Sequence, residues 1–223
     1  GRIIGGQEVK ECQYPWQVYI RTPKGNCGGT LVDNKHVITA AHCIYYYDLS
    51  SFYRILLLHS EIFLENRFII MIFPRFTEFY WNDIAVITLA EELEFSVCVQ
   101  PACLPSPSLN ISTGVRCLAS GWGVTSALST QPTILQEAII PILRQASCSA
   151  YGNLMDGNKI CAGYLQGGID SCEGDSGGPL MCADGELWVL AGVISFGNGC
   201  ARPGYPGVYT NVLNSLSWLQ TVL

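Results

Sequence analysis

Short runs of β-branched and aromatic residues recur along most of this 223-residue chain, with glycine, proline or asparagine between them. Such runs predict strands, because these side chains pack well on a pleated surface. Many short strands at regular spacing are typical of β-barrels and β-sandwiches. The predicted strands cover residues 16–20, 36–39, 53–58, 67–72, 85–89, 115–119, 135–142, 188–195 and 207–212, with a turn at 24–26.

Two segments depart from the strand pattern. Residues 101–113 are rich in proline and serine and form the natural connector between two halves of the chain. Near the C-terminus, apolar residues recur at helical spacing at Val212, Leu216, Leu219 and Val222. We therefore expect an all-β chain that ends in a helix.

The charge balance excludes one broad class of function. The net charge is −6, charged residues make up 13% of the chain, and there is no basic tract. A nucleic-acid surface needs clustered positive charge, so we expect no nucleic-acid partner. The longest apolar run, residues 68–73, is far shorter than the roughly 18 residues that a membrane helix needs. We expect no membrane segment in this chain.

The cysteine content indicates an oxidising compartment. The chain has eleven cysteines, and Asn110-Ile111-Ser112 matches the pattern for glycosylation at Asn110. Both features are typical of secreted proteins. Since the sequence carries no signal peptide, we expect it to be the mature or excised part of a longer secreted precursor.

A serine flanked by glycines lies in the stretch from Asp170 to Pro179, which reads DSCEGDSGGP. Glycines allow a tight turn and let a substrate approach the main chain, so Ser176 is a candidate nucleophile on a constrained loop. A serine hydroxyl is a poor nucleophile near neutral pH. It needs a histidine base, and that base needs a carboxylate to orient it.

Candidates for both partners occur earlier in the chain. His42 follows an apolar run in TAAHC, and Asp83 begins a predicted strand in NDIA. Taken singly, the three residues could be a core histidine, a capping aspartate and a turn serine. Because they lie far apart in the sequence, only tertiary folding can bring them together.

The order of these motifs resembles the chymotrypsin and trypsin family of serine proteases. Further motifs extend the resemblance over essentially the whole chain: IIGG near the start, CGGTL, GWG and PGVYTNV. The resemblance implies a single peptidase domain, residues 1–223, with residues 1–2 left from a propeptide. It also implies two packed six-stranded antiparallel β-barrels, an N-terminal one over 3–105 and a C-terminal one with the terminal helix over 106–223.

The resemblance assigns roles to the three candidate residues. Ser176 would attack the peptide carbonyl, His42 would move the proton, and Asp83 would orient His42. The backbone N–H groups of Gly174 and Ser176 would hold the negative oxygen of the intermediate. No cofactor and no metal ion are implied.

The resemblance also implies a primary pocket with Asp170 at its base. A buried carboxylate without a cation loses solvation, so the pocket should prefer the side chain of arginine or lysine. Gly197 and Gly207 would leave the pocket open, Glu173 would lie at its rim, and Tyr80 would form an apolar subsite. The remaining substrate-binding residues implied are Ser171, Ser195, Phe196 and Tyr209, of which Ser195 also helps to hold Asp83.

Activation is implied at the start of the chain. Cleavage between Arg2 and Ile3 would free the α-amino group of Ile3, which in the family inserts beside the carboxylate matched here by Asp175. The alternative for this segment is a flexible leader. Because Gly1 and Arg2 are present, we expect the chain to be the uncut, zymogen-like form. The structure can therefore show an inactive conformation.

Cysteine pairing cannot be read from spacing alone. The resemblance implies Cys27–Cys43, Cys117–Cys182, Cys148–Cys161 and Cys172–Cys200, and it implies that Cys103 binds a propeptide upstream. Cys12 and Cys98 remain, and we expect them to pair, the alternative being a free thiol on either residue.

The leading hypothesis is a secreted serine endopeptidase that cleaves after Arg or Lys through an acyl-enzyme and is activated between Arg2 and Ile3. Its partners would be protein or peptide substrates, an activating protease and protein inhibitors. It would be extracellular, either secreted or as the extracellular part of a membrane-anchored precursor. The alternative is a protease-like binding module that has lost catalysis.

Overall fold

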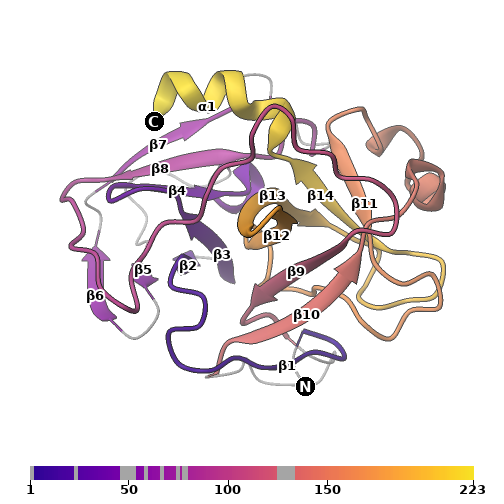
Figure 1. Ribbon diagram of the computed structural model, residues 1–223, viewed down its shortest axis with the longest axis horizontal. Coiled ribbons are helices and arrows are strands. Elements are labelled where there is room, and N and C mark those ends of the chain that lie inside the picture. Colours follow the sequence, from indigo (N-terminus) through magenta and orange to yellow (C-terminus); the bar gives the residue numbers. More distant parts are fainter. Residues whose placement is uncertain are drawn as a thin grey trace.

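Two antiparallel β-sheets make up most of the computed structural model, and they lie side by side in Figure 1. The structure describes residues 3–22, 25–45, 54–57, 60–65, 68–73, 76, 80–124 and 134–223. Arg2, the predicted activation residue, lies outside these ranges, as do the ends of several predicted strands and part of the predicted turn at 24–26. The fold class is confirmed as mostly strands in two sheets with few helices.

The first sheet has the strand order β6-β5-β2-β3-β4-β8-β7. Its strands pair antiparallel throughout, and β2 and β3 form a hairpin in which Thr22 pairs with Gly25. Gly25 and Asn26 therefore belong to strand β3, contrary to the predicted turn, and Lys24 lies outside the described residues. The bounds are β2 Gln17–Thr22, β3 Gly25–Leu31, β4 His36–Thr39, β5 Arg54–Leu57, β6 Ser60–Glu65, β7 Phe68–Ile72 and β8 Ala85–Leu89.

The second sheet has the order β1-β10-β9-β12-β13-β14-β11. It encloses a separate apolar core that includes Ile140, Leu180 and Tyr209. The bounds are β1 Gln7–Glu8, β9 Arg116–Gly121, β10 Gln136–Pro141, β11 Lys159–Ala162, β12 Pro179–Asp184, β13 Leu187–Phe196 and β14 Gly207–Asn211.

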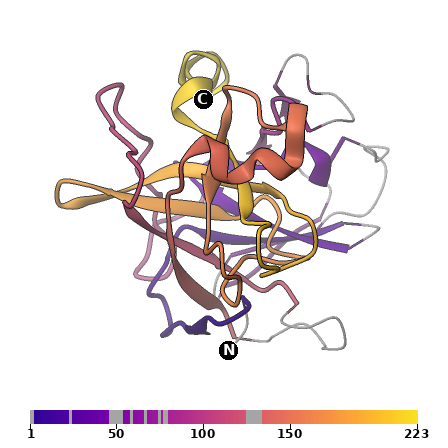
Figure 2. The same ribbon diagram turned by 90° about the vertical axis from the view of Figure 1, so that its right-hand side faces the viewer.

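The helical segments are short. The 3-10 helix η1 (Ala41–Cys43) follows β4, η2 (Gln145–Leu154) lies in front of the second sheet in Figure 2, and η3 (Leu213–Ser215) leads into α1 (Leu216–Val222). The predicted terminal helix is thus present, and it is divided into two pieces. No helix among the described residues has the length and apolar character to cross a bilayer.

Both ends of the chain pack on the opposite half of the molecule. The strand β1 pairs with β10 of the second sheet, and Ile3 is fully buried in the second core. Leu219 of α1 is fully buried in the first core instead. The division at residues 105 and 106 therefore does not hold at the chain ends, because each end buries its apolar side chains across the boundary.

The sheets also contain strands that the sequence did not predict. Each sheet has seven strands among the described residues, compared with the six expected per barrel. In the second sheet, the additional strand is the two-residue β1. Strand β3 was missed because three of its residues are glycines, which disfavour strands unless another backbone must approach closely.

Five disulfides join the described residues, and they are the five expected pairs. The Cys27–Cys43 bond ties β3 to η1, and Cys172–Cys200 ties the Ser176 loop to the loop before β14. Cys103 is exposed and has no disulfide partner among the described cysteines. The other three pairs are Cys12–Cys98, Cys117–Cys182 and Cys148–Cys161.

The two sheets meet closely at one glycine of β3. The N–H of Gly28 donates to the carbonyl oxygen of Ser176 at 2.7 Å. A Cβ atom on Gly28 would lie 2.7 Å from the Cα of Gly178, closer than any real contact. Glycine is therefore required at this position of the first sheet, because the backbone of the Ser176 loop from the second half of the chain packs directly on it.

Candidate active site

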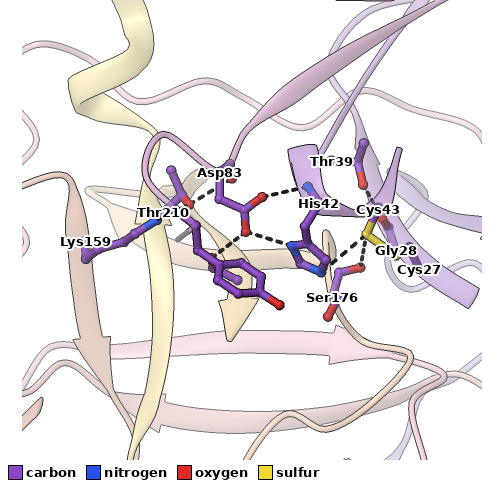
Figure 3. A network of polar contacts seen from close by, with 11 residues as sticks. Cys27, Gly28, Thr39, His42, Cys43, Asp83, Lys159, Ser176 and Thr210 are labelled. Atoms are coloured by element: carbon purple, nitrogen blue, oxygen red, sulfur yellow. Dashed lines mark hydrogen bonds and ion pairs between the residues drawn. A yellow bond between two sulfur atoms is a disulfide. The ribbon is translucent and has the colours of Figure 1, made fainter. Parts of the chain in front are cut away.

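Three segments bring His42, Asp83 and Ser176 together. His42 lies in η1, directly after β4, and Asp83 lies two residues before β8, which pairs with β4. Ser176 lies in the loop before β12, on the side of the second sheet that meets β3. Figure 3 shows Ser176 beside the ring of His42, on the side away from Asp83.

The carboxylate of Asp83 is fully buried and accepts hydrogen bonds at both oxygens. One oxygen, Oδ1, accepts from the backbone N–H of His42 at 2.9 Å. The other, Oδ2, lies 2.8 Å from His42 Nδ1 and accepts from Ser195 Oγ at 2.5 Å. This arrangement fixes the ring of His42 with Nδ1 toward Asp83 and Nε2 toward Ser176.

The electrostatics of Asp83 favour its charged form. Burial by itself would raise the pKa of Asp83, but the charge and hydrogen bond of His42, the hydrogen bond of Ser195 and the charge of Lys159 outweigh burial and lower it. Asp83 is therefore an anion that can hold His42 in one tautomer and stabilise its positive form.

The loop of Ser176 leaves two backbone donors available, one on each side of Asp175. The N–H groups of Asp175, Gly177 and Gly178 donate to carbonyl oxygens of Cys172, Ile194 and Asp175, respectively, at 3.0, 2.8 and 2.9 Å. Within the described part of the chain, the N–H groups of Gly174 and Ser176 have no acceptor. Gly174 has a φ of 93°, which favours glycine at this point of the loop.

A cavity of about 230 Å³ opens beside Ser176 and His42. Asp170 lies at this cavity and is only 3% exposed. Its Oδ2 accepts from the N–H of Ala201 at 2.9 Å, whereas its Oδ1 is buried without a partner among the described residues. Burial raises the pKa of Asp170 to about 6, although hydrogen bonds from the N–H groups of Ala201 and Ser171 partly oppose this rise.

The cavity walls match most of the residues expected at the pocket. Those that line it include Ser171, Glu173, Ser195, Phe196, Gly197 and Gly207. A Cβ atom on Gly207 would lie 3.0 Å from Asp170 Oδ1, so glycine keeps the space above this oxygen open. Glu173 is exposed at the surface.

Tyr209 does not line the cavity, contrary to expectation. Its side chain is fully buried in the second core, and its hydroxyl lies 3.5 Å from Ser171 Oγ. Gly207 and Tyr209 lie on the same face of β14, and a Cβ atom on Gly207 would lie 3.0 Å from the hydroxyl of Tyr209, so the tyrosine ring packs under the glycine instead of reaching the cavity. Tyr209 therefore supports the cavity from behind.

Asp175 is a second buried carboxylate, directly before Ser176. It accepts from the N–H groups of Gly123 at 2.6 Å and Cys172 at 2.9 Å. Burial raises the pKa of Asp175 to about 7, although the hydrogen bonds from these two donors partly oppose this rise. No cationic side chain among the described residues pairs with it.

Two glycines make room for Asp175. A Cβ atom on Gly121 would lie 2.1 Å from Asp175 Oδ1, and one on Gly123 would lie 2.4 Å from Oδ2. The GWG motif is thus explained by the carboxylate that packs against it.

The start of the chain is also bonded to the candidate site. The carbonyl oxygen of Ile4 accepts from the N–H of Asp170 at 3.1 Å. Ile3 and Ile4 are therefore part of the packed structure, rather than a flexible leader.

Aromatic rings surround the outer side of the site. The ring of Tyr80 packs edge-on against His42, with 5.2 Å between ring centroids, and lies 5.3 Å from the ring of Phe196. Tyr80 and Phe196 both line the cavity, as expected for an apolar subsite.

One group of potential metal ligands lies among the described residues, and its chemistry does not fit a metal. It consists of Cys27, His42 and Cys43. The two sulfur atoms form a disulfide, so they are not thiolates that could bind a metal ion.

Sequence reasoning missed two residues that support the site. Thr39 Oγ1 donates to the carbonyl oxygen of Gly28 at 2.8 Å, and Lys159 Nζ donates to the carbonyl oxygen of Tyr80 at 2.6 Å. Lys159 had one available signal, since it is a lysine at the start of a short apolar run in NKICA.

Two comparisons with known proteins agree with this geometry. A family model described as Trypsin matches residues 3–219. Human transmembrane protease serine 5 is 37% identical over 233 residues, which cover 98% of this chain and 51% of that protein. The chain therefore spans about half the length of this curated relative.

The two buried carboxylates predict how stability depends on pH. The folded pKa values of Asp170 and Asp175, about 6 and about 7, lie above those of an unfolded chain near 4. Both groups therefore favour folding at low pH, and this contribution is lost as pH rises from about 4 to about 7. We expect Asp175→Asn to remove roughly 2–4 kcal/mol of this pH dependence.

The measurement is urea unfolding of the uncut protein at several pH values, with disulfides intact, in a Ser176→Ala background that prevents self-digestion. The difference between the parent and Asp175→Asn isolates this carboxylate from Asp83, whose lowered pKa acts in the opposite direction. Parallel pH curves for the two proteins would contradict the assignment.

Proposed function

The chain belongs to the trypsin family of serine proteases, and from this premise we propose that it is an endopeptidase that cleaves peptide bonds after arginine or lysine. The proposal rests on two features that lie at the same cavity. The Asp83–His42 pair lies beside Ser176, and Asp170 offers an unpaired oxygen to the same cavity. The first feature supplies the reaction, and the second selects the substrate.

The proposed reaction proceeds through an acyl-enzyme. Ser176 Oγ attacks the carbonyl carbon of the substrate while His42 Nε2 takes the hydroxyl proton, as in the reference triads of this family. The tetrahedral intermediate collapses when His42 gives this proton to the leaving amine. Water then attacks the acyl carbon and loses a proton to His42, and His42 returns this proton to Ser176 Oγ as the bond to the acyl group breaks and the acid product leaves. Asp83 stays ionised and stabilises the positive His42 in both halves.

The negative oxygen of the intermediate needs donors that are already in place. The free N–H groups of Gly174 and Ser176 are the candidates, since their neighbours in the loop are bonded within the protein. In proteases of this kind, removal of one such donor costs on the order of 10²–10³ in rate.

Preference for arginine or lysine follows from the environment of Asp170. A buried carboxylate with an unpaired oxygen has lost its hydration. It therefore gains more free energy from a cationic ligand than an exposed carboxylate does. Gly207 leaves the approach to this oxygen open, and Ser171 adds a hydroxyl beside it. A neutral or acidic side chain would leave Asp170 without a partner.

Activation is proposed at the Arg2–Ile3 bond. Ile3 is fully buried, so a cut before it would create a charged amino group at the edge of the second core. Asp175, which lacks a cationic partner among the described residues, is the carboxylate that this amine would join. The ion pair would lower the pKa of Asp175 and stabilise the neighbouring loop of Ser176. Cleavage would require an activating protease.

The setting of the protein is proposed from the same features. Five disulfides indicate an oxidising, extracellular environment. We propose that the chain is secreted or is the extracellular part of a membrane-anchored precursor, in line with the name of its human relative. Cys103 and Asn110 are both exposed and available for an upstream disulfide and for a glycan, respectively. Protein inhibitors would bind the same cavity as substrates.

The alternative of a catalytically silent binding module is testable by chemical labelling. We expect the protein cut between Arg2 and Ile3 to hydrolyse a small arginyl ester or amide and to react with a fluorophosphonate at Ser176. Ser176→Ala should abolish both reactions, whereas Ser108→Ala, at an exposed serine, should leave them unchanged. A cleanly cut protein that neither reacts nor hydrolyses would favour the binding module.

The pocket predicts a pH-dependent affinity for cations. A small amidinium compound should bind the cut Ser176→Ala protein more tightly as pH rises, because it pairs with ionised Asp170. We expect roughly tenfold tighter binding per pH unit below about 6 and a plateau above about 7. Calorimetry at several pH values measures this. Asp170→Asn should remove the pH dependence and most of the affinity, and an affinity that is constant from pH 5 to 8 in the parent would refute the role of Asp170.

A further inference from the structure

Lys159 is an unusual residue for the interior of a protein. It is 4% exposed at the first position of β11. Buried lysines are almost always paired with a carboxylate. Within the described residues, however, Lys159 forms no ion pair within 4 Å and is held by neutral oxygens. Such a placement costs solvation, and this cost indicates that the charge has a role that a hydrophobic residue would not fill.

The ammonium group is held at two points behind the site. Its Nζ donates to the carbonyl oxygen of Tyr80 at 2.6 Å and to Thr210 Oγ1 at 3.2 Å. Thr210 lies directly opposite Lys159 in the β11–β14 pairing, and its hydroxyl donates to the carbonyl oxygen of Asp83 at 2.9 Å. Figure 3 shows Lys159 and Thr210 on the side of Asp83 away from His42.

The segment that Lys159 contacts has an unfavourable backbone conformation. Tyr80 and Asn82 both have positive backbone φ values, 60° and 51°, which residues other than glycine rarely adopt. The residue before Lys159 contacts the same segment, since Asn158 Nδ2 donates to Asn82 Oδ1 at 3.2 Å. Two adjacent residues of the second half of the chain thus hold the strained segment that precedes Asp83.

The charge of Lys159 also acts on the site itself. It faces the carboxylates of Asp83, from the segment before β8, and Asp156, from the turn before β11. Beyond Asp83 lie His42 of η1 and the phenol of Tyr80. The ring of Phe196 in β13 lies 5.9 Å from Nζ and carries no charge. Burial lowers the pKa of Lys159, while the two carboxylates oppose this effect.

We propose that Lys159 is a positioning residue for the proposed hydrolysis: it holds the Tyr80–Asp83 segment in its strained conformation and supplies a buried positive charge behind Asp83. This inference rests on the proposed function. A positive charge behind Asp83 offsets part of the negative charge that would attract a proton to the ring of His42. Without Lys159, the full negative charge of Asp83 would act on the His42 ring, whose Nδ1 lies 2.8 Å from Oδ2, so we expect activity to be lost at a higher pH on the acid side.

The test compares Lys159→Met, which fills the space without charge, with Lys159→Arg, which keeps the charge. For the cut enzyme, the acid midpoint of kcat/KM on an arginyl substrate should move to higher pH in Lys159→Met, with about threefold lower activity at pH 6 relative to its own plateau. Lys159→Arg should keep the midpoint of the parent. The proposal is overturned if Lys159→Met keeps that midpoint, or if Lys159→Arg moves as far as Lys159→Met.

Two further measurements keep the outcome clear. If Lys159→Met does not fold, Lys159→Gln replaces it, because glutamine retains a donor for Tyr80 without the charge, and it should move the midpoint as predicted for methionine. In the Ser176→Ala protein, the NMR signal of the His42 Nδ1 proton can be followed against pH without any turnover. Failure of the parent to hydrolyse substrate would refute the proposed function, whereas identical NMR midpoints with and without Lys159 would refute only the role of Lys159.

Discussion

The contact between Gly28 and the loop of Ser176 determines whether the two halves of this molecule form one site. His42 directly follows β4 of the first sheet, and Ser176 lies in the loop before β12 of the second, so neither half has a complete site alone. The N–H of Gly28 donates to the carbonyl oxygen of Ser176, and the hydroxyl of Thr39 donates to the carbonyl oxygen of Gly28. These two hydrogen bonds connect β4 to β3 and β3 to the Ser176 loop. Gly177 continues this close fit, since a Cβ atom there would lie 2.2 Å from Thr39 Oγ1.

Around this junction, three buried aspartates have three different environments. Asp83 accepts hydrogen bonds from His42 and Ser195, and its pKa is lowered. Asp170 has one unpaired oxygen in the cavity, and Asp175 has two backbone donors and no cation among the described residues; burial raises the pKa of both. The same side chain is thus an anion with hydrogen-bond donors in one place and, in the other two, a carboxylate without a cationic partner among the described residues. We propose that the substrate supplies the cation for Asp170 and that a new amino terminus supplies it for Asp175.

Short motifs carried most of what could be predicted from the sequence. His42, Asp83 and Ser176 each lie in a short motif, and the order of these motifs gave the resemblance to the trypsin family. Asp170 was predicted from that resemblance, by its position before Ser176. The placement of Tyr209 behind the cavity, the exchange of the chain ends between the two cores and the partners of Lys159 depend on packing between distant segments. No local pattern encodes that packing. Strand β3 was missed for a related reason, because its glycines serve a neighbouring loop rather than the strand.

The most direct test of this account measures the rate at which a fluorophosphonate labels Ser176 in the cut protein when Gly28 is replaced by alanine. Gly157→Ala is the matched control, because a Cβ atom on Gly157 meets no other atom within 4 Å. The account predicts that Gly28→Ala slows labelling at least about tenfold, since the added methyl displaces the Ser176 loop from His42, and that Gly157→Ala labels at the parental rate. Equal labelling rates for the two variants would contradict it.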